Sequence, residues 1–205
     1  MEKYIDLTQP IIDKMPHHPY DDDMHLNHDK LLNKDGYTNY TLQIGTHFGT
    51  HIDLPMHLTS DSRYVCDFPI DKFIGRGKVI DVRGLTTIEY LPFYDDLISK
   101  EDIVLFYTGF DELYGKDKYY NNHPCITENL AQFLVRKEIK ILGMDTPSPD
   151  YYPFNVHKLL LNNDIFILEN LRNLSLLMDK DYFKIHSVPL NIYSDASPLR
   201  AYCIY

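Results

Sequence analysis

Short apolar runs separated by Gly, Pro, Asp and Asn recur along most of the chain, and this pattern predicts β-strands. The six clearest runs lie at 37–45, 77–82, 102–109, 139–146, 164–171 and 186–192. Residues 127–138 and 155–163 instead have helical spacing, with Thr127 and Asn155 as the expected N-caps. Strands and helices thus alternate in the second half, while the first half is mainly β-structure. The pattern predicts a mixed α/β fold.

The most polar stretch, residues 17–30, has too few apolar positions to form a buried element and predicts a long surface loop. The chain has 205 residues, of which 44% are hydrophobic and 24% charged. That length and composition suit one domain spanning 1–205, with a single substantial core.

The net charge of the chain limits the kinds of molecule that it is expected to bind. The 20 basic and 30 acidic residues give a formal net charge of −10, which disfavours nucleic acid and anionic membrane surfaces. The sequence shows neither a secretory signal pattern nor a run approaching the roughly 18 apolar residues of a membrane span. We therefore expect a cytoplasmic protein that binds a small molecule. Its three cysteines form no CxxC pair, so neither a disulfide framework nor a thiolate zinc site is indicated.

One stretch, GTHFGTHIDLPMHL at 45–58, carries His47, His51, Asp53 and His57 within eleven positions. A helix would not place all four on one face, and Pro55 would interrupt it. In an extended chain the four share one side, because all occupy odd positions and the even positions from 48 to 58 are mostly apolar. A straight strand would still hold His47 and Asp53 about 20 Å apart, so the chain must bend if the four are to meet.

Imidazole and carboxylate donors together suit Zn²⁺, Mn²⁺ or Fe²⁺. A lone histidine would be read as a surface residue. Three of the chain's 10 histidines beside one aspartate favour a metal site instead.

The segment HFGTHIDLPMH resembles the HxGTHxDxPxH signature of the cyclase-like metal-dependent hydrolases, a family that includes bacterial kynurenine formamidase and isatin hydrolase, and it meets every fixed position. The resemblance extends to YIDLTQPIIDKMP near the start, to GMDTPSPD, and to FILENLRNL followed by SVPLNIYSDASPLRAYCIY. It implies a swivelling β/β/α domain in the α/β class, with an irregular barrel-like mixed sheet and flanking helices. It also implies a homodimer or homotetramer.

Carried over residue by residue, the resemblance implies one or two divalent ions per chain, with zinc favoured over manganese. His47, His51 and Asp53 would bind the first ion, and His157 and Glu169, which are 12 residues apart, would bind the second. The carboxylates of Asp53 and Glu169 would be able to bridge the two ions. Glu169 also ends an apolar run, where an unpaired buried carboxylate would be costly.

The resemblance implies that His57, the remaining histidine of the segment, is the catalytic acid/base, and a free imidazole, whose pKa is near 6.5, is matched to proton transfer. The implied enzyme is a metal-dependent, arylformamidase-like hydrolase. It would use metal-activated water to cleave a small amide, lactam or ester, acting on C–N bonds other than peptide bonds. Two alternatives stay open: kynurenine formamidase proper, which converts N-formylkynurenine to kynurenine and formate, and a non-catalytic metal-binding protein of the same fold. The intact His57 favours an enzyme.

The start of the chain differs from that of kynurenine formamidase. Kynurenine formamidase has a Trp near its start that stacks on the substrate ring, whereas this chain has MPHHPYDDD there and no Trp at all. His18 and Tyr20 are the predicted substrate-binding residues, since either offers a flat face. Asp145 is either a supporting carboxylate or a turn residue, and His123 is either a pocket residue or a plain loop residue.

Overall fold

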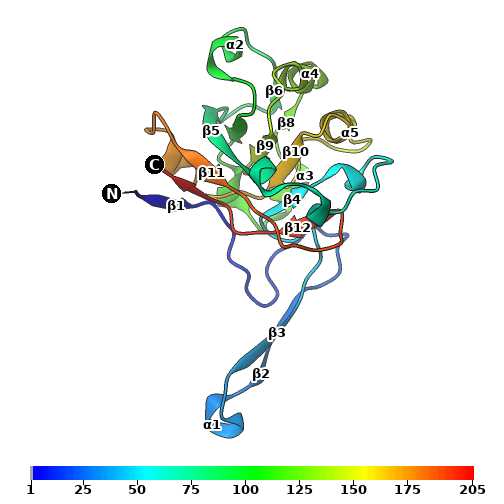
Figure 1. Ribbon diagram of the computed structural model, residues 1–205, viewed down its shortest axis with the longest axis vertical. Coiled ribbons are helices and arrows are strands. Elements are labelled where there is room, and N and C mark those ends of the chain that lie inside the picture. The colour runs from blue at the N-terminus through cyan, green and yellow to red at the C-terminus, as the bar shows by residue number, and fades with distance from the viewer. Residues whose placement is uncertain (1) are drawn as a thin grey trace.

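The computed structural model describes residues 2–205 and arranges them around a nine-stranded mixed sheet that curls strongly into a half-barrel (Figure 1). Across the sheet the order is β1 (Tyr4–Asp6), β13 (Tyr202–Ile204), β11 (Lys184–His186), β5 (Ile74–Asp81), β7 (Ile103–Tyr107), β9 (Ile141–Met144), β10 (Phe166–Glu169), β4 (His51–Asp53) and β12 (Ala196–Pro198). Strands β5, β7, β9 and β10 are parallel, and the remaining pairs are antiparallel. This confirms the predicted α/β class with a barrel-like mixed sheet.

Helices flank the sheet and short turns connect its strands. The α-helices of the body are α2 (Tyr94–Leu97), α3 (Asp117–Asn121), α4 (Glu128–Arg136) and α5 (Asn155–Leu161). The 3₁₀ turns are η1 (Pro55–His57), η2 (Val65–Asp67), η3 (Ile70–Phe73), η4 (Phe110–Leu113) and η5 (Leu174–Leu177). A small parallel pair is formed by β6 (Thr87–Ile88) and β8 (Cys125–Ile126). Within residues 2–205, no helix combines the length and apolar character that crossing a membrane requires.

The central strands β7, β9 and β10 are buried on both faces, which explains their nearly continuous apolar sequences. Val104 and Ile167 belong to the core on the side of α4 and α5. Leu105 and Leu168 belong to a second core on the other side, which also contains Leu174 of η5. The sheet therefore lies between two cores, and its alternation decides which side chains face the helices.

Most predicted elements are present, and most are shorter than predicted, although β5 begins earlier, at Ile74. Five of the predicted strands are present as β3 (Asn39–Gln43), β5, β7, β9 and β10, and the predicted helix at 127–138 is α4. Its expected N-cap is confirmed, because the Thr127 hydroxyl accepts a hydrogen bond from the Leu130 N–H at 3.2 Å. The predicted strand at 186–192 is wrong after His186. Pro189 has no N–H to donate to a ladder and makes only an isolated bridge to Leu199.

Helix α5 begins where it was predicted but not with the expected cap. The N-cap position is Phe154, in a left-handed conformation with φ of 60°. The Asn155 side chain instead donates to Glu128. The carboxylate of Asp150, from the preceding loop, accepts the Val156 N–H at 2.8 Å and so satisfies the first turn.

The predicted loop at 17–30 is wrong in its second half, because residues His25–Lys30 form strand β2. This strand pairs with β3 (Asn39–Gln43), and α1 (Leu32–Asp35) lies at the tip between them. The hairpin forms its own two-stranded sheet and projects away from the body (Figure 1). Pairing with β3 satisfies the backbone without burial, so a polar sequence suffices for this strand.

Candidate metal centre

Strands β4 and β10 place three of the predicted ligands on one face of the sheet. In their antiparallel register His51 lies opposite Glu169, and Asp53 lies opposite Ile167. Directly opposed residues point to the same side, which here is the side of α5. Ile52, between the two β4 ligands, points into the other core. The alternation of odd and even positions in the sequence therefore places the predicted ligands on one face of the sheet and apolar core residues on the other.

Bends at both ends of β4 return the flanking histidines to the strand. Gly49 precedes β4 with φ of 58°, a conformation that glycine adopts without strain, and η1 follows it. As a result the His47 Nδ1 atom lies 2.8 Å from the Asp53 Oδ1 atom. The rings of His47 and His57 are 4.2 Å apart between centroids.

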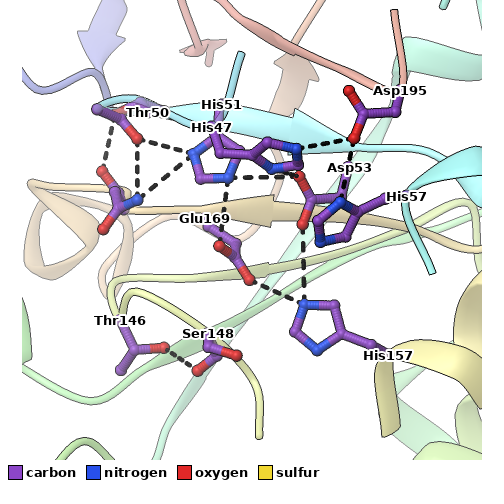
Figure 2. A network of polar contacts seen from close by, with 12 residues as sticks. His47, Thr50, His51, Asp53, His57, Thr146, Ser148, His157, Glu169 and Asp195 are labelled. Carbon is purple, nitrogen blue, oxygen red and sulfur yellow. Dashed lines mark hydrogen bonds and ion pairs between the residues drawn. The ribbon is translucent and has the colours of Figure 1, made fainter. Parts of the chain in front are cut away.

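His157 comes from α5, whose apolar residues anchor the helix in the core. Its side chain is buried, and its Nε2 atom lies 3.2 Å from Glu169 Oε1 and 3.7 Å from Asp53 Oδ2. The structure thus brings six of the predicted residues into one cluster (Figure 2): His47, His51, Asp53, His57, His157 and Glu169.

The orientation of two imidazoles is fixed from outside the cluster. The Nδ1–H of His51 donates to the Gly49 carbonyl at 2.9 Å, and the Nδ1–H of His157 donates to the Asp150 carboxylate. Both partners can only accept, so each ring carries its proton on Nδ1 and turns the Nε2 lone pair toward the carboxylates. This arrangement is typical of metal-binding histidines.

The two carboxylates offer one oxygen to each side of the cluster. Asp53 Oδ1 is near His47 and, at 3.3 Å, His51, while Oδ2 faces His157. Glu169 Oε2 lies 3.3 Å from His51 Nε2, and Oε1 faces His157. Yet Asp53 Oδ1 and Glu169 Oε1 are buried and lack a hydrogen-bond donor among residues 2–205. Ligands around a tetrahedral ion with bonds near 2.0 to 2.1 Å are about 3.3 Å apart, so the spacing fits donors aimed at a shared cation.

Two sets of donor atoms each lie within 4.8 Å of one another: His47, Asp53 and His57, and His51, Asp53 and Glu169. Asp53 belongs to both sets, as a bridging ligand would. Distance alone does not separate His57 from the ligands, so its predicted role depends on its hydrogen bonds.

Electrostatics hold the carboxylates in their charged form. Burial would lower the pKa of His47, but Asp53 and Asp195 outweigh burial and raise it to about 9. Burial would likewise raise the pKa of Asp53, but the neighbouring imidazoles His47 and His51 hold it well below its usual range. The centre is therefore an anionic pocket that retains positive charge, as a cation site requires.

Asp195 was not found from the sequence. Its Oδ2 atom accepts hydrogen bonds from His57 Nδ1 at 3.1 Å and His47 Nε2 at 3.0 Å (Figure 2). The two imidazoles hold the pKa of its carboxyl below the usual range. Asp195 immediately precedes β12, which pairs with β4, and its carbonyl accepts the Leu54 N–H. The only sequence signal was its place in the closing segment SDASPLR.

A second supporting network joins the end of β10 to the turn before β4. Asn170 follows Glu169, and its side-chain amide donates to the Gly49 carbonyl at 2.9 Å. The Tyr119 hydroxyl donates to the Asn170 side chain at 2.8 Å, and the Thr50 hydroxyl donates to the Asn170 carbonyl at 2.7 Å. These bonds fix both strands that carry the ligands.

A cavity of about 340 Å³ opens beside the cluster, within the size range of small-molecule sites. Its lining includes His18, whose role in substrate binding stays a prediction, together with Leu58, Tyr120 and Phe154. Tyr20 is 93% exposed, contacts His18 and lies outside the lining, so its role in binding stays a prediction. Among the described residues, the lining includes no Lys or Arg.

Asp145 and His123, for which the sequence allowed two roles each, lie outside this cavity. Asp145 accepts hydrogen bonds from the N–H and hydroxyl of Thr108 and from the Gly109 N–H, so it stabilises the turn after β7. Burial raises the pKa of Asp145 to about 6. His123 is buried against Tyr151 at 4.2 Å between ring centroids, and neither ring nitrogen has a hydrogen-bond partner in residues 2–205.

Known proteins resemble this one over almost all of its chain. The model of the Cyclase family matches residues 5–151. An uncharacterised protein of Methanocaldococcus jannaschii is 33% identical over 204 residues, which cover 98% of each chain. The kynurenine formamidase of Bacillus anthracis is 31% identical over 209 residues, covering 97% of this chain and 96% of that enzyme.

Among solved structures, isatin hydrolase A from Ralstonia solanacearum superposes with a TM-score of 0.87. The alignment covers 99% of this chain and 92% of that chain, at 20% sequence identity. The two proteins therefore share their fold.

Proposed function

The chain belongs to the Cyclase family, as its HxGTHxDxPxH segment suggested, and we propose that it is a metal-dependent hydrolase of a small amide, lactam or ester. Similarity to kynurenine formamidase supports a C–N bond outside peptides as the bond that is cleaved. The observation that carries the proposal is the convergence of imidazole and carboxylate donors, two of whose oxygens lack partners among residues 2–205, beside a cavity of substrate size.

In this proposal His47 and His51 hold one ion, His157 holds a second, and the carboxylates Asp53 and Glu169 serve both. The support is that each carboxylate directs different oxygens toward different histidines. Zinc is favoured over manganese because the histidines outnumber the carboxylates. An ion bound there supplies Lewis-acid chemistry, polarising a carbonyl group and making water more acidic.

His57 carries the proton in the proposed reaction. Its Nδ1–H donates to Asp195, which leaves Nε2 as the ring atom able to accept a proton. His57 takes this proton from the attacking water and returns it to the leaving nitrogen or oxygen, while the Asp195 carboxylate stabilises the imidazolium in between. A non-catalytic metal-binding protein would need no imidazole held in this way.

We propose a small neutral substrate rather than N-formylkynurenine. The chain has no Trp for stacking, and the cavity lining, as far as the structure describes it, offers no Lys or Arg for a substrate carboxylate. The lining instead supplies apolar surface from Leu58, Tyr120 and Phe154. On this proposal N-formylkynurenine is hydrolysed less efficiently than a neutral substrate. The alternative function, kynurenine formamidase proper, would make N-formylkynurenine the preferred substrate.

The proposal is tested by metal content and hydrolysis measured on the same preparation. After incubation with excess Zn²⁺ or Mn²⁺ and desalting, we expect about one to two ions per chain and turnover of at least one member of a panel of neutral amides, lactams and esters. A chelator should remove both ion and activity, and added metal should restore both. Retention of less than about one ion per chain would contradict the ligand assignment.

Three variants separate binding from catalysis. His51→Ala should lose the ion, whereas His57→Ala should keep it and lose about 10²- to 10⁴-fold in kcat. His25→Ala, on the exposed hairpin, is the matched control and should keep both. An ion that binds without any turnover on the panel would favour the non-catalytic metal-binding protein. Loss of the ion in His57→Ala would make His57 a ligand and leave the proton carrier unassigned.

A further inference from the structure

A second hollow, with a volume of about 620 Å³, lies outside the metal centre and is called the Gln9 groove below. Among the described residues, it shares no lining residue with the cavity beside the metal ligands. Its apolar walls include Ile11, Leu42, Ile44, Leu190, Ile192 and Leu199. The volume is within the range of small-molecule sites, so the groove is a separate candidate for ligand binding.

Gln9 turns an unused side-chain amide toward this groove. Only 7% of the residue is exposed, and its backbone N–H already donates to the Thr50 hydroxyl at 2.8 Å. The amide has no hydrogen-bond partner among residues 2–205, but it is not enclosed by protein, so it faces the groove that Gln9 lines. An amide offers two N–H donors and one acceptor oxygen. Gln9 is therefore placed to bind a polar group of a ligand.

Arg172 brings a positive charge to the same groove. The other arginine of the groove, Arg200, is paired with Asp6 through two hydrogen bonds, at 3.0 and 2.7 Å. Arg172 is partly buried, and within the described residues its guanidinium has neither a hydrogen-bond acceptor nor an ion-pair partner. Its backbone N–H donates to the Leu7 carbonyl, which holds it beside the segment that carries Gln9. A planar guanidinium in this state matches a carboxylate in shape and charge.

The charge around the groove favours a ligand with one negative group. Because Asp6 neutralises Arg200, the lining has a net charge of +1, in a chain whose net charge is −10. The free guanidinium attracts a single anion, whereas a second negative charge on the ligand would be repelled by the acidic chain. The walls favour an apolar body, and they are open to it, since Leu42 is 47% and Leu190 58% exposed.

We propose that the Gln9 groove binds a small molecule that carries one carboxylate on an apolar body. The carboxylate accepts hydrogen bonds from the Arg172 guanidinium and from the Gln9 amide, and the apolar body lies against the leucine and isoleucine side chains. This ligand differs in charge from the neutral substrate proposed for the metal centre. Its binding does not depend on the reaction at that centre, because the two sites have no described lining residue in common.

Octanoate is the probe, and its binding to the full-length protein is measured by NMR titration with and without bound Zn²⁺. We expect saturable binding with a dissociation constant below about 1 mM in both forms. 1-Octanol keeps the apolar chain without the charge, and acetate keeps the charge without the chain. Each should bind at least about tenfold more weakly than octanoate.

Two substitutions locate the ligand. Arg172→Gln should weaken octanoate binding about 10- to 100-fold, and Gln9→Leu, which replaces the amide by an apolar side chain, should weaken it about tenfold. Arg83→Gln, at an exposed arginine outside the groove, is the matched control and should bind octanoate like the wild type. Circular dichroism should show all three variants folded.

Four results would overturn the proposal. Binding that disappears when Zn²⁺ is removed would place octanoate at the metal centre, and equal affinity of Arg172→Gln and the wild type would place it elsewhere on the chain. Absence of saturable binding at about 10 mM octanoate would leave the groove without this ligand. Hydrogen exchange without octanoate tests for another occupant, because protection of residues 9–11 and 190–192 that increases with protein concentration would show that a second copy of the chain fills the groove.

Discussion

One oxygen of Asp195 holds two histidines, which gives this residue a testable effect on turnover. In Asp195→Asn the side chain stays the same size but can no longer offset the charge of a protonated His57. We expect kcat to fall about 10- to 100-fold, with KM and metal content close to those of the wild type. Asp179→Asn, at an exposed carboxylate outside the cavity lining, is the control. Loss of the ion in Asp195→Asn would show that Asp195 acts through His47 instead.

Cys125 provides a test of whether a thiol takes part in the reaction. Burial raises the pKa of the Cys125 thiol to about 11, so the reactive thiolate is scarce at pH 8. Alkylation by iodoacetamide, followed by mass spectrometry, should be slow at pH 8 and should accelerate about tenfold per pH unit toward pH 10, because deprotonation increases with pH. Cys125→Ser should keep its activity. Rapid labelling at pH 7 with loss of turnover would indicate a nucleophilic cysteine.

The sequence identified the residues of the cluster more readily than the residues that orient them. His47, His51 and Asp53 are close in the chain, and their alternation with apolar positions marks a single face. Asp195 and His57 are 138 residues apart and meet only because β12 pairs with β4. That pairing joins three-residue strands, which are too short to show a period.

At the scale of elements, strands that belong to longer β-like runs of the sequence were predicted, and most strands of three residues were not. The apolar runs of β7, β9 and β10 follow directly from burial between two cores. In contrast, β1 and β13 have three residues each, and β1 becomes the edge strand beside β13 through pairing between the two ends of the chain. In the β2–β3 hairpin the strand predicted at 37–45 is β3, whereas β2 was missed because its polar sequence lacks the signal that a core imposes.

The two elements that carry Glu169 and His157 also differ in how far the local sequence predicts the position of the ligand. Glu169 could be predicted at the end of an apolar strand, where a buried carboxylate needs a cation or a donor. The position of His157 could not, since it depends on how α5 crosses between β9 and β10. Only the spacing of 12 residues, interpreted through the family resemblance, connected the two beforehand.

At the scale of the whole molecule, two features weaken the attraction of an anionic substrate. The chain has a net charge of −10, and the cavity lining, within residues 2–205, includes no Lys or Arg. Both disfavour a substrate that carries a carboxylate, while the apolar lining accepts an aromatic ring. Formanilide and N-formylanthranilate differ only by one carboxylate beside the formamide, so they isolate this effect. We expect a higher kcat/KM for neutral formanilide.

Salt should distinguish long-range repulsion from poor fit in the cavity. Raising the ionic strength from about 0.01 M to 0.15 M shortens the Debye length from about 30 to 8 Å. The kcat/KM for N-formylanthranilate should therefore rise with salt, while that for formanilide should change little. Asp21→Asn, which removes one carboxylate from the cavity lining, should narrow the difference between the two substrates at low salt. A preference for the anionic substrate that weakens as salt is added would mean that a cationic group attracts it, and the neutral-substrate proposal would then be wrong.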